Sequence, residues 1–173
     1  MSVIKGTRLD LVVLSGELLD ACLADDLPRA HRLAAFAFPD DLARRCEWMS
    51  IRRSEVLADP AWEPGSLRAM VLRNEQRMVG FTSFHGPPGI DDTGTAGAAE
   101  IGYTVFPEFR CPGYATETCR GMLEWARREH GVRHFISGIE PSNGASLRVI
   151  EKLGFTSMDL LVDGESIFEL RVP

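Results

Sequence analysis

One stretch of the chain, residues 100–117, constrains the fold more than any other. It reads E-I-G-Y-T-V-F-P-E-F-R-C-P-G-Y-A-T-E: apolar residues alternate as in a strand, Pro107 predicts a turn, and an amphipathic helix is expected to open across residues 110–115. The first N–H groups of a helix lack a partner within it and lie at the positive end of its dipole. Because Gly113 also lets the backbone approach a ligand closely, this order predicts an anion site. An ordinary helix start punctuated by proline and glycine is the alternative.

A second stretch, residues 143–155, reads N-G-A-S-L-R-V-I-E-K-L-G-F. The string Arg110-x-x-Gly113-x-Ala115 resembles the pyrophosphate loop of the GNAT acyl-CoA N-acetyltransferases, which follows a strand in that family. Residues 143–155 resemble the second characteristic block of the same family, and are similar to the subgroup that includes the ribosomal-protein alanine N-acetyltransferases. Two matches in the family's order are much harder to obtain by chance than one, so the resemblance favours a functional anion loop.

Composition narrows the class of protein. The 173 residues fit a single domain, residues 1–173, of ordinary globular composition. A net charge of -6 argues against general nucleic-acid binding. No apolar run reaches the roughly 18 residues of a membrane span, and the N-terminus lacks a signal segment, so we expect a cytoplasmic protein with no membrane partner. The four cysteines show no metal-ligand spacing and are expected to be reduced thiols in the core.

The periodicity of the remaining chain predicts alternating strands and helices. Besides the central strand, strands are expected at residues 7–14, 67–72, 78–84, 134–139, 155–162 and 166–172. Helices are expected from Ser15, at 28–38, at 41–57, from Arg110 and at 143–153, the last capped by Ser142 and Gly154. Residues 59–65 are interpreted as a loop, and residues 85–97 as a surface excursion rather than a lid. This is also the element order of the GNAT fold, which predicts an α/β fold: a single domain with a mixed, mostly antiparallel sheet and helices on both faces.

The resemblance implies acetyl-CoA as the cosubstrate and an amine as the acceptor. In the family, the backbone of the central strand pairs with the pantetheine arm, the loop takes the pyrophosphate through its N–H groups, and the asparagine of the second block hydrogen-bonds the pantetheine amide or lies beside the thioester. The implied cofactor-binding residues of this chain are Tyr103, Thr104, Val105, Arg110, Cys111, Gly113, Tyr114, Ala115, Thr116 and Asn143. No metal is expected.

Glu100 is the candidate base. Direct attack on the thioester needs an amine with a free lone pair, and deprotonation at pH 7 costs roughly 4.6 kcal/mol for a lysine-like amine but about 1.4 kcal/mol for an α-amino group. Glu100 is expected to start the central strand, where many family members place a glutamate that accepts a proton, often through water. A strand-edge carboxylate in a salt bridge or in solvent is the alternative.

The leaving thiolate lacks the acid that the resemblance would imply. Many family members place a tyrosine seven residues after the asparagine, but Ile150 occupies this position and cannot donate a proton. Ser146 is therefore the second candidate catalytic residue, as a hydrogen-bond donor to the sulfur or to the cofactor. An exposed helical serine is the alternative. Lys152 is interpreted as a surface residue or as a contact to the cofactor's 3′-phosphate.

Several functions remain open at this point. The acceptor amine belongs either to a protein N-terminus or to a small molecule. A non-catalytic acyl-CoA-binding or regulatory module would keep the loop and lose the chemistry, and Ile150 supports this alternative. A nucleotide-binding protein of another fold is disfavoured, because no Lys-Ser/Thr pair follows the glycine loop. The sequence does not decide whether the chain forms a homodimer.

Overall fold

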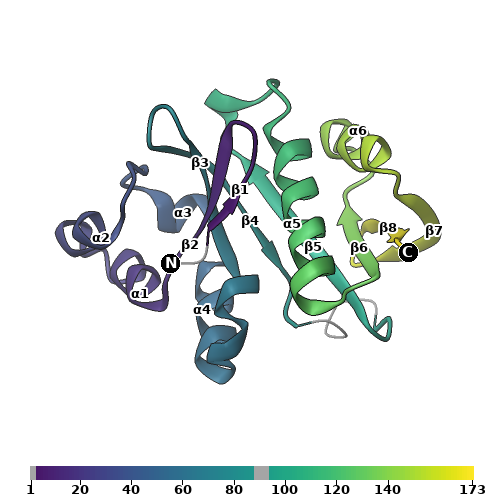
Figure 1. The fold of residues 1–173 in the computed structure, drawn as a ribbon, viewed down its shortest axis with the longest axis horizontal. Coiled ribbons are helices and arrows are strands. Elements are labelled where there is room, and N and C mark those ends of the chain that lie inside the picture. Colours follow the sequence, from purple (N-terminus) through teal and green to yellow (C-terminus); the bar gives the residue numbers. More distant parts are fainter. Residues whose placement is uncertain (1–2, 88–93) are drawn as a thin grey trace.

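The computed structural model describes residues 3–87 and 94–173, and within them one eight-stranded sheet organises the chain (Figure 1). Its order is β1-β2-β3-β4-β5-β6-β8-β7, and every neighbouring pair is antiparallel except β5 and β6, which are parallel. The strands are β1 (Val3–Lys5), β2 (Leu9–Val13), β3 (Leu67–Leu72), β4 (Arg77–Phe84), β5 (Ala98–Val105), β6 (His134–Ile139), β7 (Thr156–Val162) and β8 (Glu165–Arg171). The predicted mixed, mostly antiparallel sheet is confirmed. Residues 88–93, part of the predicted surface excursion, lie outside the described residues.

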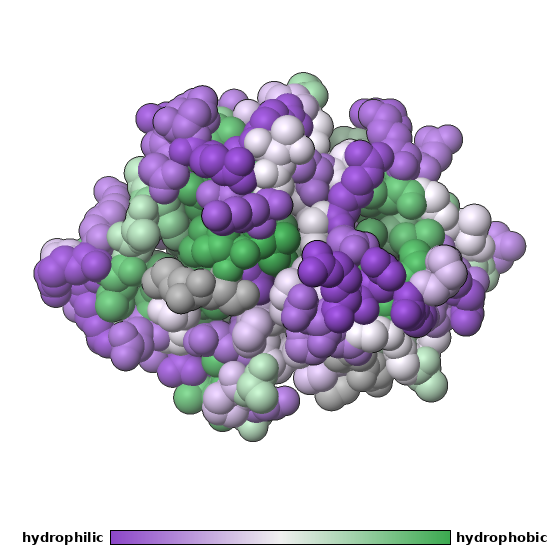
Figure 2. All heavy atoms as spheres, in the orientation of Figure 1, coloured by the Kyte–Doolittle hydropathy of each residue, from purple (hydrophilic) through white to green (hydrophobic). Residues whose placement is uncertain are grey.

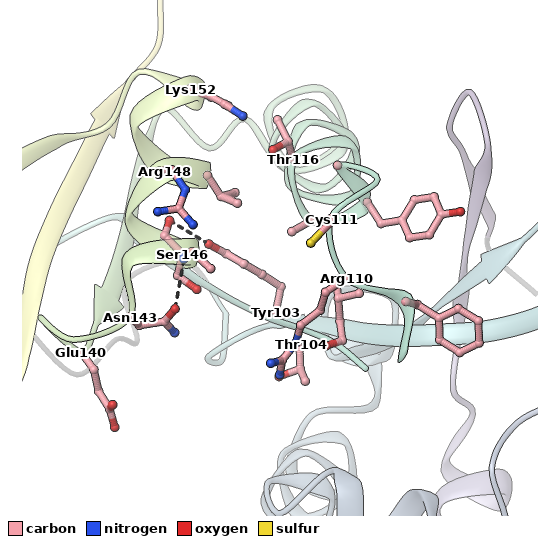
Figure 3. A pocket seen from close by; sticks show the side chains of 17 residues that line it. Tyr103, Thr104, Arg110, Cys111, Thr116, Glu140, Asn143, Ser146, Arg148 and Lys152 are labelled. Carbon is pink, nitrogen blue, oxygen red and sulfur yellow. Dashed lines mark hydrogen bonds between the residues drawn. The ribbon is translucent and has the colours of Figure 1, made fainter. Parts of the chain in front are cut away.

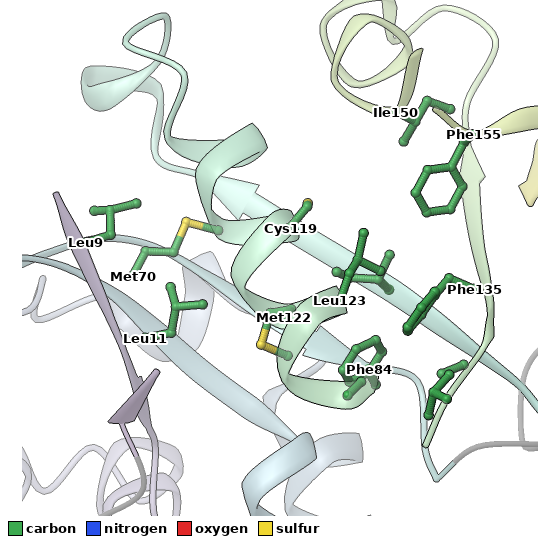
Figure 4. Close-up of a cluster of buried hydrophobic side chains, with 14 of the residues drawn as sticks. Leu9, Leu11, Met70, Phe84, Cys119, Met122, Leu123, Phe135, Ile150 and Phe155 are labelled. Carbon is green, nitrogen blue, oxygen red and sulfur yellow. The ribbon is translucent and has the colours of Figure 1, made fainter. Parts of the chain in front are cut away.

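Alternate side chains of the strands enter two large cores, one on each face of the sheet, and a third, smaller cluster consists of Ala98, Ile136 and Ile167. On one face, apolar residues of β2 to β6 pack against the long helix α5 (Tyr114–His130) and against α6 (Gly144–Leu153) (Figure 4). Four apolar residues of α5 are buried there at helical spacing, and full burial of the two larger side chains, those of Met122 and Leu123, contributes roughly 1.5–3 kcal/mol each: Cys119, Met122, Leu123 and Ala126. On the other face, the intervening strand residues pack against the first helices of the chain. The prediction of helices on both faces is therefore confirmed.

The N-terminal elements differ in part from the prediction. The short edge strand β1 was not predicted. Helix α1 (Gly16–Leu23) begins as expected, because the Ser15 hydroxyl accepts a hydrogen bond from the Leu18 N–H at 3.4 Å. Helix α2 (Leu27–Leu33) is shorter than the predicted range 28–38, because Ala34 adopts an extended conformation. Ala37, within the predicted range, is exposed and forms a β-bridge with Arg77 of β4.

The predicted helix at residues 41–57 is wrong as a single element. It is divided into α3 (Leu42–Arg45) and α4 (Met49–Ala58), because Cys46 leaves the helical conformation (φ −120°, ψ 81°). Neither proline nor glycine marks this break in the sequence, and Leu42, Cys46 and Met49 are all buried across it. The predicted loop at 59–65 contains a 3-10 helix, η1 (Pro60–Gly65), which buries Trp62.

The second half of the chain follows the prediction closely, with two corrections. Helix α5 begins at Tyr114 and not at Arg110, since Gly113 is left-handed (φ 86°) and a short 3-10 helix, η2 (Pro107–Phe109), fills the turn. Asn143, not Ser142, caps α6: its side-chain oxygen accepts from the Ser146 N–H at 3.1 Å. The left-handed Gly154 ends that helix as predicted.

The surface and the thiols complete the description. The face in Figure 2 is mostly hydrophilic, with apolar side chains gathered in separate patches. In the described part of the chain, no helix has the length and apolar character needed to cross a membrane.

Cys22, Cys46 and Cys119 are buried free thiols as expected, but Cys111 is exposed, so its assignment to the core is wrong. The cause is its place in the turn before α5, outside the sheet and its two cores.

Candidate active site

The site begins where β5 and β6 separate. These two strands pair over only three residues, the last pair joining Glu100 to Ile136, and β5 then continues to Val105 beside β4 alone. The carbonyls of Glu100 and Gly102 point toward β4, where they accept hydrogen bonds. The backbone groups of Tyr103 point the opposite way, because successive strand residues alternate. The Ile101 carbonyl on this side still accepts a hydrogen bond from the Ser137 hydroxyl of β6 at 3.2 Å, so in the described part of the chain the open edge of β5 begins after Ile101.

A groove of about 580 Å³ lies along this edge (Figure 3). One wall is formed by the end of β5 and the turn that leads into α5, and the other wall is formed by α6. All ten residues predicted to bind the cofactor line it, and so does Ser146. Glu100 is not among the lining residues. The other groove residues are Phe109, Glu140, Ala145, Arg148, Val149 and Lys152.

The turn before α5 forms the anion loop, residues 110–116. Two of its residues have positive φ angles, Cys111 at 85° and Gly113 at 86°, and this conformation turns the chain sharply into the helix. The Glu117 N–H donates the first helical bond, to the Gly113 carbonyl at 3.2 Å. The N–H groups of residues 114–116 therefore lie ahead of the helical ladder and point outward from the helix start, where they can donate to an anion.

Arg8 fastens the anion loop to the start of β2. Its Nη1 donates to the Pro112 carbonyl at 2.8 Å, and its Nε donates to Oε2 of Glu117 at 2.8 Å. The guanidinium carbon lies 4.9 Å from the centre of the Tyr114 ring. Burial raises the pKa of Glu117, but hydrogen bonds from the backbone N–H groups of Arg8 and Leu9 and from the Arg8 side chain outweigh it and lower that pKa. Glu117 is therefore a carboxylate that Arg8 neutralises beside the anion loop.

The α6 wall presents polar groups to the groove. The Tyr103 hydroxyl donates to the Ser146 carbonyl at 3.4 Å, which joins β5 to α6 across the floor (Figure 3). Burial raises the pKa of Tyr103, so its phenol stays protonated at neutral pH. The side-chain oxygen of Asn143 is used by the helix cap, which leaves its NH₂ group to donate to a ligand. The Ser146 hydroxyl lines the groove and, within the described residues, makes no hydrogen bond to the protein.

Glu100 lies at the branch point of the sheet, as the third residue of β5 and not at its start as predicted. Its side chain is only 3% exposed, and its Oε1 lies 3.4 Å from Nδ1 of His85, whose side chain is 31% exposed. Strand alternation places Glu100 and Tyr103 on opposite faces of β5. The interpretation of Glu100 as a strand-edge carboxylate in solvent is thus excluded, whereas its contact with His85 is an ion pair whenever the imidazole is protonated.

Ile150 lies on the buried face of α6. It is 2% exposed and packs in the core that α5 and α6 share with the sheet (Figure 4). The position where many family members carry a tyrosine therefore faces the core in this chain. In the described ranges, no three His, Cys, Asp or Glu side chains are placed to share a metal ion.

Sequence reasoning missed two contributors to the site. Arg8 is separated from its partners by more than a hundred residues, and no local signal connects them. Arg148 could have been found, because it stands one helical turn before Lys152 on the same face of α6.

A family model described as an acetyltransferase (GNAT) domain matches residues 8–156, and the chain belongs to this family. Two curated relatives from Bacillus subtilis (strain 168) carry the descriptions uncharacterized N-acetyltransferase YnaD and YjdG. YnaD is 29% identical over 85 residues, which cover 49% of this chain and 46% of YnaD. YjdG is 31% identical over 86 residues, which cover 50% of this chain and 48% of YjdG. The chain thus spans about half the length of the curated relatives it matches.

Solved structures show the same fold over nearly the whole chain. An acetyltransferase from Agrobacterium tumefaciens strain C58 has a TM-score of 0.66 at 18% identity, covering 99% of this chain and 95% of that one. The ribosomal-protein-S5-alanine acetyltransferase from Vibrio fischeri has a TM-score of 0.66 at 14% identity, covering 99% and 97%. RimL, a ribosomal L7/L12 α-N-protein acetyltransferase in complex with coenzyme A, has a TM-score of 0.63 at 18% identity, covering 99% and 98%. The predicted resemblance to the GNAT family is confirmed.

Proposed function

We propose that the protein transfers an acetyl group from acetyl-CoA to a primary amine, either a protein N-terminus or a small molecule, by direct attack in a ternary complex. The observation that carries this proposal is the groove itself, because one continuous cavity contains an open strand edge, a helix start that can bind an anion, and two side chains able to donate to a thioester. The cytoplasm remains the expected location.

The groove residues fit the chemistry of coenzyme A. The N–H groups of residues 114–116, the Thr116 hydroxyl and Arg110 would hold the diphosphate. The Tyr103 backbone on the open edge of β5 would pair with the pantetheine amides as an added strand does. The Asn143 amide would donate to the carbonyl of the arm or of the thioester. Acetyl-CoA supplies an activated acyl group whose thiolate, with an ordinary pKa of about 8.5, is already a fair leaving group.

In the proposed reaction, the amine nitrogen forms a bond to the thioester carbonyl carbon, the carbon–sulfur bond breaks, and the amine proton passes to Glu100. Because Glu100 does not line the groove, the transfer would proceed through water or through a movement at the branch point between β5 and β6. Ser146 would donate a hydrogen bond to the departing sulfur from the α6 wall. Ile150 takes no part in this mechanism, since it lies in the core.

The second candidate function is an acyl-CoA-binding or regulatory module without catalysis. The buried Ile150 in place of the family tyrosine favours it, as does the absence of Glu100 from the groove lining. The two functions differ in one measurable respect: the module binds acetyl-CoA without turning it over.

Measuring the release of free coenzyme A distinguishes the transferase from the non-catalytic module. The purified protein is mixed with acetyl-CoA and a panel of α-amino peptides, amino acids and polyamines, and free coenzyme A is followed. We expect acceptor-dependent release that falls by two or more orders of magnitude in Glu100→Gln. The matched control is Glu129→Gln, which removes a carboxylate from an exposed position near the end of α5 and should retain full activity.

The outcomes are distinct. Full activity in Glu100→Gln would remove Glu100 from the mechanism while leaving the transferase assignment intact. Binding of acetyl-CoA with no release for any acceptor would favour the module. Absence of acetyl-CoA binding would refute both functions.

A further inference from the structure

His85 connects the buried Glu100 to the surface. It directly follows β4, and its backbone N–H donates to the Glu100 carbonyl at 2.8 Å, so the two residues are held side by side. Nδ1 of its imidazole lies 3.4 Å from Oε1 of Glu100. The Glu100 side chain is 3% exposed and that of His85 is 31% exposed. An incoming amine therefore meets the imidazole before it can meet the carboxylate.

The other end of the imidazole faces the open stretch of β5. An ideal Cβ built at Gly102 would lie 2.7 Å from Nε2 of His85, so this glycine leaves the room that the ring occupies. Gly102 directly follows Ile101, where the open edge begins, and precedes Tyr103, which lines the groove. The imidazole thus extends from Glu100 to the part of β5 along which the pantetheine arm is proposed to lie.

A second carboxylate lies close to Glu100. An ideal Cβ built at Gly138 of β6 would contact Oε2 of Glu165, the first residue of β8, and would lie 3.5 Å from Oε1 of Glu100. Two carboxylates beside one imidazole make the surroundings of His85 negatively charged. Negative charge attracts amines, which are largely ammonium ions at neutral pH.

One imidazole can pass a proton from one of its nitrogens to a group beside the other. With Nδ1 protonated and directed at Glu100, Nε2 carries a lone pair that can accept a proton. The amine would give a proton to Nε2 of His85 while Nδ1 gives its own proton to the carboxylate. Glu100 then ends protonated, the imidazole ends neutral in its other tautomer, and the amine nitrogen has the lone pair that attacks the thioester.

We infer that His85 is a catalytic residue that relays the amine proton to Glu100. This inference rests on the proposed function, in which Glu100 accepts the proton although it does not line the groove. The relay takes the place of the water or the movement that the transfer would otherwise need.

The test follows the release of free coenzyme A, using the amine of the panel above that the wild type acetylates fastest. The variants are His85→Gln, Glu100→Gln and both together. We expect His85→Gln to lower kcat about a hundredfold, while the acceptor KM and the affinity for coenzyme A stay within about twofold. The double variant should be no slower than Glu100→Gln, because two residues that act as one unit lose their contribution only once.

Chemical rescue distinguishes a relay from a structural role. In His85→Ala, added imidazole should raise kcat about tenfold, whereas in Glu100→Gln it should change nothing. The matched control is His31→Gln, which removes an exposed imidazole from α2 and should keep full activity.

Full activity in His85→Gln would overturn the inference, as would a loss confined to the binding of acceptor or coenzyme A. Losses that multiply in the double variant would also overturn it, since the two residues would then act independently. Absence of rescue in a folded His85→Ala would make the role of the imidazole structural. Release with no acceptor by the wild type would instead refute the proposed transferase.

Discussion

Replacing Arg8 with glutamine removes the side chain that connects the start of β2 to the anion loop. The variant loses the bond to the Pro112 carbonyl, the ion pair with Glu117 and the position over the Tyr114 ring. The backbone N–H groups of Arg8 and Leu9 still donate to Glu117. The carboxylate therefore stays in place next to the helix start, but without its neutralising cation.

The expected loss of folding free energy in Arg8→Gln follows from these contacts. The Arg8 side chain is 45% exposed and that of Glu117 is 15% exposed, so solvent screens the pair and it contributes about 1 kcal/mol. The bond to Pro112 adds about 0.5 kcal/mol and the ring contact about 0.5 kcal/mol. The sum, about 2 kcal/mol, lowers the melting temperature of a chain of this length by about 4–8 °C. The uncompensated carboxylate should also weaken coenzyme A binding about fivefold in low salt, and less as salt screens it.

A double-mutant cycle checks this reasoning. Thermal unfolding and coenzyme A titration are measured for Arg8→Gln, Glu117→Gln and both together, with Arg32→Gln, an exposed residue of α2, as the control. We expect the double variant to bind coenzyme A more tightly than Arg8→Gln, because the repelling charge is gone. If Arg8→Gln matches the control in both melting temperature and affinity, or if the second substitution restores nothing, the assigned role of Arg8 is refuted.

Three further predictions concern the anion loop and the helices α5 and α6. Gly113→Ala should cost about 1–2 kcal/mol in urea unfolding, because φ is 86° while the added methyl has room; an unchanged midpoint would contradict this. Ile150→Tyr should lose about 1–3 kcal/mol through overpacking and gain no thiol release, and faster release would show that the family tyrosine can act here. The folded pKa of Glu117 lies below its ordinary value of 4.5, so its stabilisation is present above that pH and is lost as pH falls through the folded value; acid unfolding of Glu117→Gln should lack this component.

Much of the site could be predicted because it is encoded locally. The loop before α5 and the exposed face of α6 follow from short strings, and all ten predicted cofactor residues line one groove. Glu100 shows the limit of this approach. Its place in β5 was nearly right, but its burial beside His85 depends on the branching of β5 and β6, which is a property of strand pairing across the chain.

Other features depend on contacts that the sequence does not signal. Arg8 meets Glu117 across 109 residues, and only the packing of β2 against α5 brings them together. The break at Cys46 lacks proline and glycine, so the apolar spacing alone predicted one continuous helix. Ser142 and Asn143 are both good capping residues, so residue type alone does not choose between them, and the structure places Asn143 at the cap.

The central claim is that the groove between β5 and α6 binds acetyl-CoA, and a crystal structure of the complex tests it most directly. We predict the diphosphate against the N–H groups of residues 114–116, and the pantetheine arm paired with the Tyr103 backbone on the open edge of β5. A cofactor bound elsewhere on the protein, or one in the groove with its diphosphate away from the start of α5, would contradict the account.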